Sequence, residues 1–324
     1  TQRSPFVRLL SSWRLRVIVT AVILGFIIYK FSFGQILANM WHADRPLLAG
    51  AIFVFVASGV LGACQWRTIL CFHGVTLDFP GTVSRYFMGL FFNFILPGFV
   101  GGDAVRIYKT ATVSGKTTQA FSSTLADRVL GLLVLVLFSI GAFFMLPEGP
   151  ADDALPAAVV MFGVLAAFIM LFAFRRLGAP VGAMFGRFLP AWLGGKISEV
   201  YDELHLLTRS PKALAKVFVL SCMIQRTRIG VHYLCARAVG MDVGFAYFAL
   251  FVPVMEIAAS LPVSFGGVGV RDMMGVTLFS LVGMGRETVI SYTFLAYAAG
   301  FAGSLPGAAA FAAGMRTGKG SERS

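Results

Sequence analysis

Residues Phe91–Arg106 read FFNFILPGFVGGDAVR, an apolar run that meets a proline, two adjacent glycines, an aspartate and an arginine. In soluble proteins a glycine turn that leads into a helix often holds an anion, because free N–H groups and the positive end of the helix dipole face it. Here the flanks are as apolar as a membrane span. The stretch therefore poses the question of why a hydrophobic segment is broken in its middle by charged residues.

The composition of the chain is that of an integral membrane protein. Of its 324 residues, 57% are hydrophobic and 13% are charged, whereas soluble domains carry roughly 25% charged residues. The mean hydropathy is +0.81. We therefore predict an all-α, polytopic helical membrane protein that forms one integral membrane domain over residues 1–324.

The net charge of +12 is explained by cytoplasmic Lys and Arg that orient the spans. No basic stripe interleaved with exposed aromatic residues occurs, so we expect no nucleic-acid partner. Basic residues precede the first apolar segment and follow the last one; they are Arg3, Arg8, Arg14, Arg16, Arg316, Lys319 and Arg323. Both termini are predicted to be cytoplasmic, in the inner membrane of a bacterial cell.

About six segments have the roughly 20 apolar residues needed to cross a bilayer. They are residues 17–33, 47–66, 124–146, 155–174, 213–236 and 288–313. Residues 175–211 form the longest polar section and contain helical apolar spacing, which predicts a cytoplasmic amphipathic helix. Residues 81–105 have basic flanks that both read as cytoplasmic, so this segment is predicted to enter the membrane and return as a broken, re-entrant hairpin. The alternative is that the two broken segments cross fully, which gives eight membrane segments.

The broken stretch occurs twice. LPGFVGGDAVR at 96–106 and LPVSFGGVGVR at 261–271 align without a gap at an offset of 165 residues, with six identities. The identical pairs are Leu96 and Leu261, Pro97 and Pro262, Gly101 and Gly266, Gly102 and Gly267, Val105 and Val270, and Arg106 and Arg271. The charge-based topology gives the two hairpins opposite orientations. Paired Gly/Pro-interrupted segments in corresponding halves are typical of transporters with a site near the membrane midplane.

The residue types of the repeated stretch are suited to binding an anion inside a membrane. Irregular backbone must be buried in protein or line a wet cavity within a membrane. Proline ends one half-helix, the glycines allow a tight turn, and Asp103 is a candidate cap for the next half-helix. Arg106 adds a positive charge near the same end, so a lipid phosphate is the predicted ligand. The alternative is a pair of packed helix kinks, which accounts for Pro and Gly but not for an arginine at both places.

Other polar residues lie in apolar surroundings. Gln225, Arg228 and His232 share one helix face, whereas Arg226 points elsewhere. Glu256 is a candidate counter-ion, with or without a role in transport. Asp127 and Arg128 open the predicted 124–146 crossing and are also compatible with a place at the membrane interface. The candidate substrate-binding residues are Asn93, Pro97, Gly101, Gly102, Asp103, Arg106, Arg128, Arg228, Glu256, Pro262, Gly266, Gly267, Arg271 and Asp272.

No motif points to a cofactor. The four cysteines form no C-x-x-C pair, so neither a zinc site nor a disulfide framework is predicted. The G-x-x-x-x-G-K-[ST] nucleotide motif is absent from the sequence. We therefore expect membrane lipids as partners, with no metal and no nucleotide.

The stretches NFILPGFVGGDAVRIY, LADRVLGLL and LPVSFGGVGVRD resemble the flippase-like membrane domain family. It includes the membrane part of lysylphosphatidylglycerol synthases and stand-alone bacterial and archaeal proteins. The resemblance covers nearly the whole chain. The second motif often ends in Arg-Glu in this family, whereas here it is Arg271-Asp272. The resemblance implies movement of lipids, such as aminoacylated phospholipids or lipid-linked glycans, between leaflets; the soluble aminoacyl-transfer domain is absent from the sequence.

Three functions remain open from the sequence. The first is a lipid translocator in which the two hairpins, with Arg106, Arg271 and Arg228, line a polar cavity. The second is a membrane enzyme acting on lipid phosphates, although no catalytic constellation stands out. The third is a scaffold for lipid or glycan synthesis.

Overall fold

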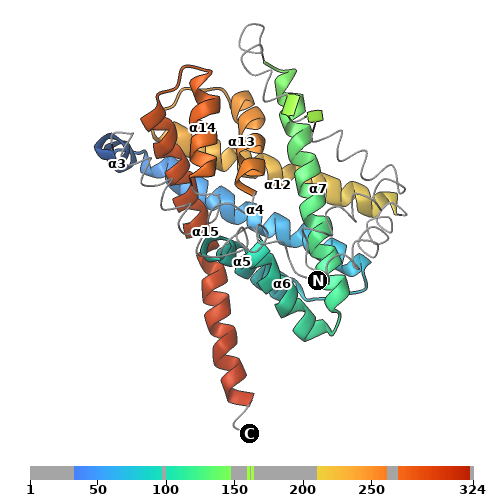
Figure 1. Ribbon diagram of the computed structural model, residues 1–324. Coiled ribbons are helices and arrows are strands. Elements are labelled where there is room, and N and C mark those ends of the chain that lie inside the picture. Colours follow the sequence, from blue (N-terminus) through green and yellow to red (C-terminus); the bar gives the residue numbers. More distant parts are fainter. Residues whose placement is uncertain are drawn as a thin grey trace, which may run out of the picture.

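A computed structural model describes residues 33–96, 100–146, 159–160, 162–163, 210–260 and 269–321. All regular secondary structure within these ranges is helical (Figure 1), which confirms the all-α prediction. The longer helices are α3 (Phe33–Trp41), α4 (Arg45–Phe72), α5 (Phe79–Ile95), α6 (Val100–Ser114), α7 (Thr117–Phe143), α12 (Pro211–Ala238), α13 (Phe245–Ser260), α14 (Val270–Ser280) and α15 (Arg286–Ser321).

Three of these helices are long and apolar enough to cross a membrane. They are α4, α7 and α15 (over Arg286–Ala313), and they match the crossings predicted at 47–66, 124–146 and 288–313. The helix α12 covers the predicted 213–236 crossing, but its charged residues lower its hydropathy. The predicted crossings at 17–33 and 155–174 and the amphipathic segment at 175–211 lie almost entirely outside the described residues.

Local sequence determines where two of the helices begin. Asp44 precedes α4, and its side chain accepts a hydrogen bond of 3.0 Å from the Leu47 N–H. Asp78 precedes α5 and accepts one of 3.1 Å from the Gly81 N–H. In each case a proline occupies the first turn, where its missing N–H is not needed. An Asp cap followed by proline thus fixes both starts.

The repeat extends well beyond the two short motifs. With the offset of about 165 residues, α4, α5, α6 and α7 correspond to α12, α13, α14 and α15. The packing follows the same correspondence: α5 against α15 matches α13 against α7, and α4 against α15 matches α12 against α7. Each half is therefore a four-helix unit, and each unit contains one helix–break–helix hairpin.

The two units have opposite orientations. The Asp44 N–H at the start of α4 donates to the carbonyl of Ala238 at the end of α12. Further along, Ser221 of α12 donates to Gln65 of α4. The two helices, which form the central helix pair, are therefore antiparallel, and because they are repeat equivalents, the repeat is inverted as predicted. Figure 1 shows the α5–α6 and α13–α14 hairpins on opposite sides of this pair.

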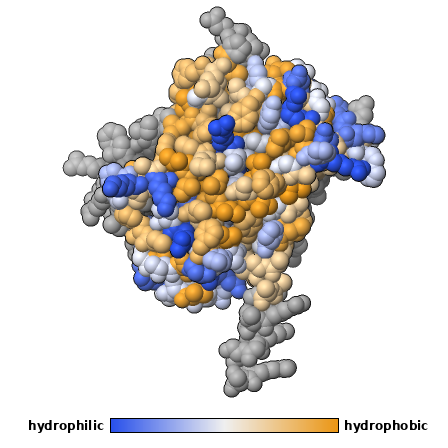
Figure 2. All heavy atoms as spheres, turned by 180° about the vertical axis from the view of Figure 1, so that it is seen from behind, coloured by the Kyte–Doolittle hydropathy of each residue, from blue (hydrophilic) through white to orange (hydrophobic). Residues whose placement is uncertain are grey.

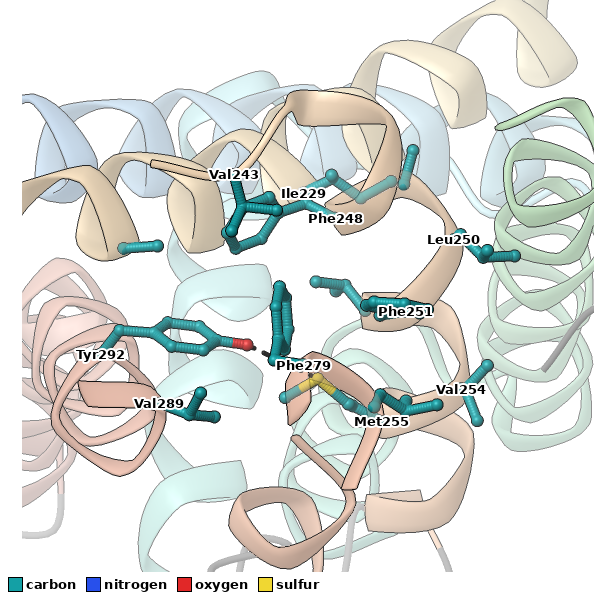
Figure 3. Packing of buried hydrophobic residues seen from close by; sticks show 14 of the residues in the cluster. Ile229, Val243, Phe248, Leu250, Phe251, Val254, Met255, Phe279, Val289 and Tyr292 are labelled. Atoms are coloured by element: carbon teal, nitrogen blue, oxygen red, sulfur yellow. Dashed lines mark hydrogen bonds between the residues drawn. The ribbon is translucent and has the colours of Figure 1, made fainter. Parts of the chain in front are cut away.

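The apolar residues form both a core and a broad outer surface. The largest buried cluster joins α12, α13, α14 and α15 (Figure 3), where the rings of Phe248, Phe279 and Tyr292 pack together. On the face shown in Figure 2, hydrophobic residues predominate across the middle, and hydrophilic residues gather mainly toward the periphery. Such a surface suits contact with lipid tails.

Candidate functional site

One hydrogen bond links the two helices of the α5–α6 hairpin, and two glycines allow them to pack closely. The Gly102 N–H donates to the side-chain oxygen of Asn93 over 3.0 Å. A Cβ atom on Gly102 would lie 1.9 Å from the carbonyl oxygen of Gly89, so the helix backbones meet there. A Cβ on Gly101 would lie 2.4 Å from the Cβ of Leu96. Both motif glycines therefore permit close approach; Pro97 lies outside the described residues.

Arg106 is buried within protein and compensated by carboxylates. Its side chain pairs with Asp127 at 3.1 Å and with Asp103 at 3.3 Å, and the residue is only 3% exposed. The guanidinium lies 4.6 Å from the ring centre of Trp66 and 5.0 Å from that of Tyr86. Cation–π contact and two carboxylates thus offset the desolvation of this charge.

A hydrogen-bonded network that includes this arginine joins four helices, α4, α6, α7 and α12. Arg128 makes a two-pronged contact with Asp103, at 2.7 and 3.1 Å. Gln65 donates to Asp127 over 3.0 Å and accepts from Ser221 over 2.8 Å. Arg106, Asp127, Asp103 and Arg128 form what we call the first cluster, in which two positive charges meet two negative ones.

Two sequence-based expectations are wrong at this cluster. Asp103 does not cap α6: it lies inside the first turn of that helix and binds Arg128 and Arg106. Asp127 does not open its helix, because α7 starts at Thr117, about three turns earlier. Its carboxylate is buried and paired. The helix extends upstream because small and polar residues, which a hydropathy threshold rejects, still pack against α4 and α6.

The second hairpin carries a different set of partners. Arg271 lies 3.4 Å from Glu256, and the same Glu256 oxygen lies 3.6 Å from the Nε2 atom of His232. The Arg271 guanidinium is 5.6 Å from the ring centre of Tyr297. These residues, Arg271, Glu256 and His232, form the second cluster. The equivalent arginines are therefore both compensated, but by side chains from different places in the repeat.

Asp272 has a capping role. Its side chain accepts a 2.8 Å hydrogen bond from the N–H of Gly269, the residue before α14. Gly269 has a φ of 86°, a backbone conformation that glycine adopts without strain. Pro262, Gly266 and Gly267 lie outside the described residues, so their predicted role in the second break stays a prediction.

Arg228 differs from the other arginines of the candidate site. It is half-buried near the middle of α12, and within the described residues no side chain forms a hydrogen bond or ion pair with it. It is close enough to interact electrostatically with Asp103 of the first cluster and Glu256 of the second. Arg226, two residues earlier, is exposed, as predicted from the helix face.

The position of Arg228 follows from the inverted repeat. Equivalent positions of the antiparallel central helix pair come closest near residues 60 and 225, where the pseudo-two-fold axis crosses it. Arg228 lies about one turn away from that point. Its repeat equivalent, Ala63, is fully buried and uncharged. Among the described residues, Arg228 is thus a half-buried cation near the axis without an ion-pair partner, whereas Arg226, also near the axis, is exposed, and the equivalent position in the other repeat carries no charge.

A small cavity adjoins the first cluster. Its lining includes Asn93, Asp103, Arg106 and Arg128, together with Tyr86, Gly89 and Leu90. Its space is on the scale of a single water molecule. The structure therefore brings four predicted site residues, from α5, α6 and α7, together around a polar space that is closed to a lipid headgroup in this conformation.

Sequence reasoning missed several members of these clusters. Asp127 was noticed only as a neighbour of Arg128, and Gln65, Trp66 and Tyr86 carried no signal because aromatic and amide residues are common in membrane helices. Among the described residues, no group of three His, Cys, Asp or Glu side chains is arranged to hold a metal ion.

These features define a polytopic membrane protein built from inverted repeats around buried charged clusters. More particularly, the chain belongs to the family described as the lysylphosphatidylglycerol synthase TM region, whose model matches residues 13–307. The resemblance found in the sequence is thereby confirmed.

Relatives of this chain come from archaea. A UPF0104 membrane protein of Pyrococcus horikoshii is 23% identical over 278 residues, covering 79% of this chain and 83% of the relative. One from Methanothermobacter thermautotrophicus is 23% identical over 300 residues, covering 86% of each. The glycosyltransferase AglD of Haloferax volcanii is 25% identical over 297 residues, covering 79% of this chain but 47% of AglD. A bacterial inner membrane stays a prediction for this chain.

Proposed function

We propose that this protein moves an anionic lipid, a phospholipid or a polyprenyl-phosphate-linked lipid, between the two leaflets of its membrane. The observation that carries the proposal is Arg228. An arginine near the centre of a membrane helix costs about 2.5–3.5 kcal/mol on insertion scales, and this one has no ion-pair partner among the described residues. A lipid phosphate that binds to Arg228 during transport supplies the negatively charged partner that this arginine lacks among the described residues.

The location of Arg228 also supports transport. Substrate sites of transporters with inverted repeats lie at the interface between the repeats, near the membrane midplane. Arg228 is on the central helix pair, with one hairpin on either side (Figure 1). In the proposed cycle the headgroup phosphate passes Arg228 while the tails stay in surrounding lipid.

The two hairpins have a supporting role in this proposal. Arg106 and Arg271 are already compensated by carboxylates, so each loses a partner when it binds a phosphate. We assign them to the hairpin structure first and to headgroup contact only when a hairpin moves. The narrow space beside Arg106 and Arg128 must widen for that contact.

Reconstitution tests the proposed activity. Purified protein is placed in liposomes that contain, one at a time, fluorescent phosphatidylglycerol, phosphatidic acid and a polyprenyl phosphate, and lipid accessible from outside is measured over time. We expect faster equilibration between leaflets than in protein-free liposomes for at least one of these lipids. Rates equal to those of protein-free liposomes for every lipid, with the protein folded, would contradict the proposal.

A second candidate is a membrane scaffold for glycan synthesis. It is favoured by the similarity to AglD, whose name describes a glycosyltransferase and of which this chain spans about half. A scaffold needs its surface rather than its buried arginines. Arg228→Gln would then leave cellular glycolipid synthesis unchanged, whereas a translocator loses function in the same variant.

A further inference from the structure

His232 lies beside charged side chains on which the protonation of its ring depends. It is 8% exposed, and its Nε2 atom lies 3.6 Å from a carboxylate oxygen of Glu256. The other ring nitrogen, Nδ1, is buried and has no hydrogen-bond partner among the described residues. A neutral ring that carries its proton on Nε2, the nitrogen nearer Glu256, therefore keeps a free lone pair on Nδ1.

Charged and titratable groups face His232 from several helices. From α13 comes Glu256, from α14 Arg271, and from α15 the ring of Tyr292 at 6.2 Å between centres. Asp272 of α14 lies next to Arg271 and caps its helix. Arg228 lies four residues before His232 on α12, so the two side chains are neighbours on one helix face.

The charged side chains of the other two helices packed against α12, which are α7 and α4, form their contacts away from His232. In α7, Asp127 and Arg128 belong to the first cluster. In α4, Arg67 donates to the carbonyl of Leu77 and Arg45 is the first residue of the helix. The charged groups nearest His232 are therefore one carboxylate, Glu256, and two arginines, Arg271 and Arg228.

We infer that His232 and Glu256 form a proton site coupled to Arg228, so that binding of a phosphate headgroup at Arg228 draws a proton onto His232. The inference rests on the proposed lipid site and adds to it the ion that accompanies the lipid. A phosphate offsets the positive charge of Arg228, which removes one of the two repulsions on the imidazolium. A hydronium ion from bulk water then gives its proton to Nδ1: one O–H bond of the hydronium breaks, the N–H bond forms, and a water molecule is left. By reciprocity, protonation of His232 strengthens headgroup binding by the same factor.

Histidine NMR on the purified full chain tests the coupling without any transport. Ring-labelled protein has four histidine signals, and the one that is missing from His232→Gln identifies His232. The ratio of protonated to neutral His232 is measured at one pH at which the wild type shows both forms. In Arg228→Gln we expect this ratio to rise about tenfold, because a positive charge is lost one helical turn away. In Glu256→Gln we expect it to fall.

Two control variants separate charge from folding. Arg228→Lys keeps the charge, and Arg226→Gln removes an equal charge from the exposed face of the same helix. Both should keep the wild-type ratio within about twofold. An unchanged ratio in Arg228→Gln, or an equal rise in Arg226→Gln, would overturn the inferred coupling.

A lipid probe completes the experiment. Dihexanoylphosphatidylglycerol carries one phosphodiester charge that does not titrate near neutral pH, so it releases and takes up no proton itself. Saturating probe should raise the His232 ratio in the wild type and leave Arg228→Gln unchanged. No rise in the wild type, or the same rise in both, would overturn the inference. This experiment does not measure leaflet exchange. A negative NMR result therefore contradicts only the coupling, whereas a negative liposome assay contradicts the proposed transport.

Discussion

Arg106 pairs with Asp127 and Asp103 and is almost fully withdrawn from solvent. Removing one partner of a buried pair leaves an uncompensated charge, which typically costs about 3–5 kcal/mol of stability. We therefore expect Arg106→Leu and Asp127→Leu each to lower the unfolding temperature strongly in detergent. The double variant should lower the unfolding temperature by less than the sum of the two single decreases, because neither Arg106 nor Asp127 then remains as a buried charge without the other.

A double-mutant cycle measures this coupling directly. Its control is Arg85→Leu, because Arg85 also lies in the hairpin but contacts backbone carbonyls rather than a carboxylate. We expect Arg85→Leu to show no coupling with Asp127→Leu. Additive losses for Arg106 and Asp127 would show that the pair does not act as a unit.

At the scale of the elements, the α5–α6 hairpin depends on backbone contact at Gly102. Since the Cβ of an alanine would lie 1.9 Å from the Gly89 carbonyl oxygen, Gly102→Ala must push the two helices apart. We expect a loss of roughly 2 kcal/mol or more in unfolding free energy, in line with overpacking of a tight interior. Reversible unfolding in mixed micelles provides the measurement.

Gly141→Ala in α7 is the matched control, since no atom lies within 4 Å of the position that the alanine Cβ would take. That variant should be as stable as the wild type or up to about 1 kcal/mol more stable, because alanine favours a helix. Equal stability of both alanine variants would contradict the tight packing of the hairpin.

Much of the element order could be predicted from the sequence. The broken motifs predicted that α5 is followed by a separate helix α6 and α13 by α14, although the re-entrant course of these pairs stays a prediction. Apolar runs predicted α4, α7 and α15, because membrane helices must satisfy their backbone within long apolar segments. The start of α7 was missed since its first turns carry Ser and Thr. The partners of Arg106 were missed for another reason: Trp66 and Asp127 come from distant segments, and no spacing within one helix encodes such contacts.

For the whole molecule, the inverted repeat makes a topological prediction. The loop between α6 and α7 and the loop between α14 and α15 are repeat equivalents. Lys116 and Gly285 are exposed in these two loops. In a variant without its four native cysteines, we expect Lys116→Cys and Gly285→Cys to react with an impermeant maleimide from opposite sides of the membrane. Labelling of both from the same side would contradict the inverted arrangement within the bilayer.

The central claim is that Arg228, a half-buried cation near the pseudo-two-fold axis with no ion-pair partner among the described residues, receives the headgroup of a lipid that crosses the membrane. Its most direct test compares Arg228→Gln with Arg226→Gln in the leaflet-exchange assay, since the two arginines lie two residues apart but differ in burial. For the lipid that the wild type moves, we predict at least a tenfold slower rate in Arg228→Gln and a near wild-type rate in Arg226→Gln, with both proteins folded. A wild-type rate in folded Arg228→Gln would contradict the claim.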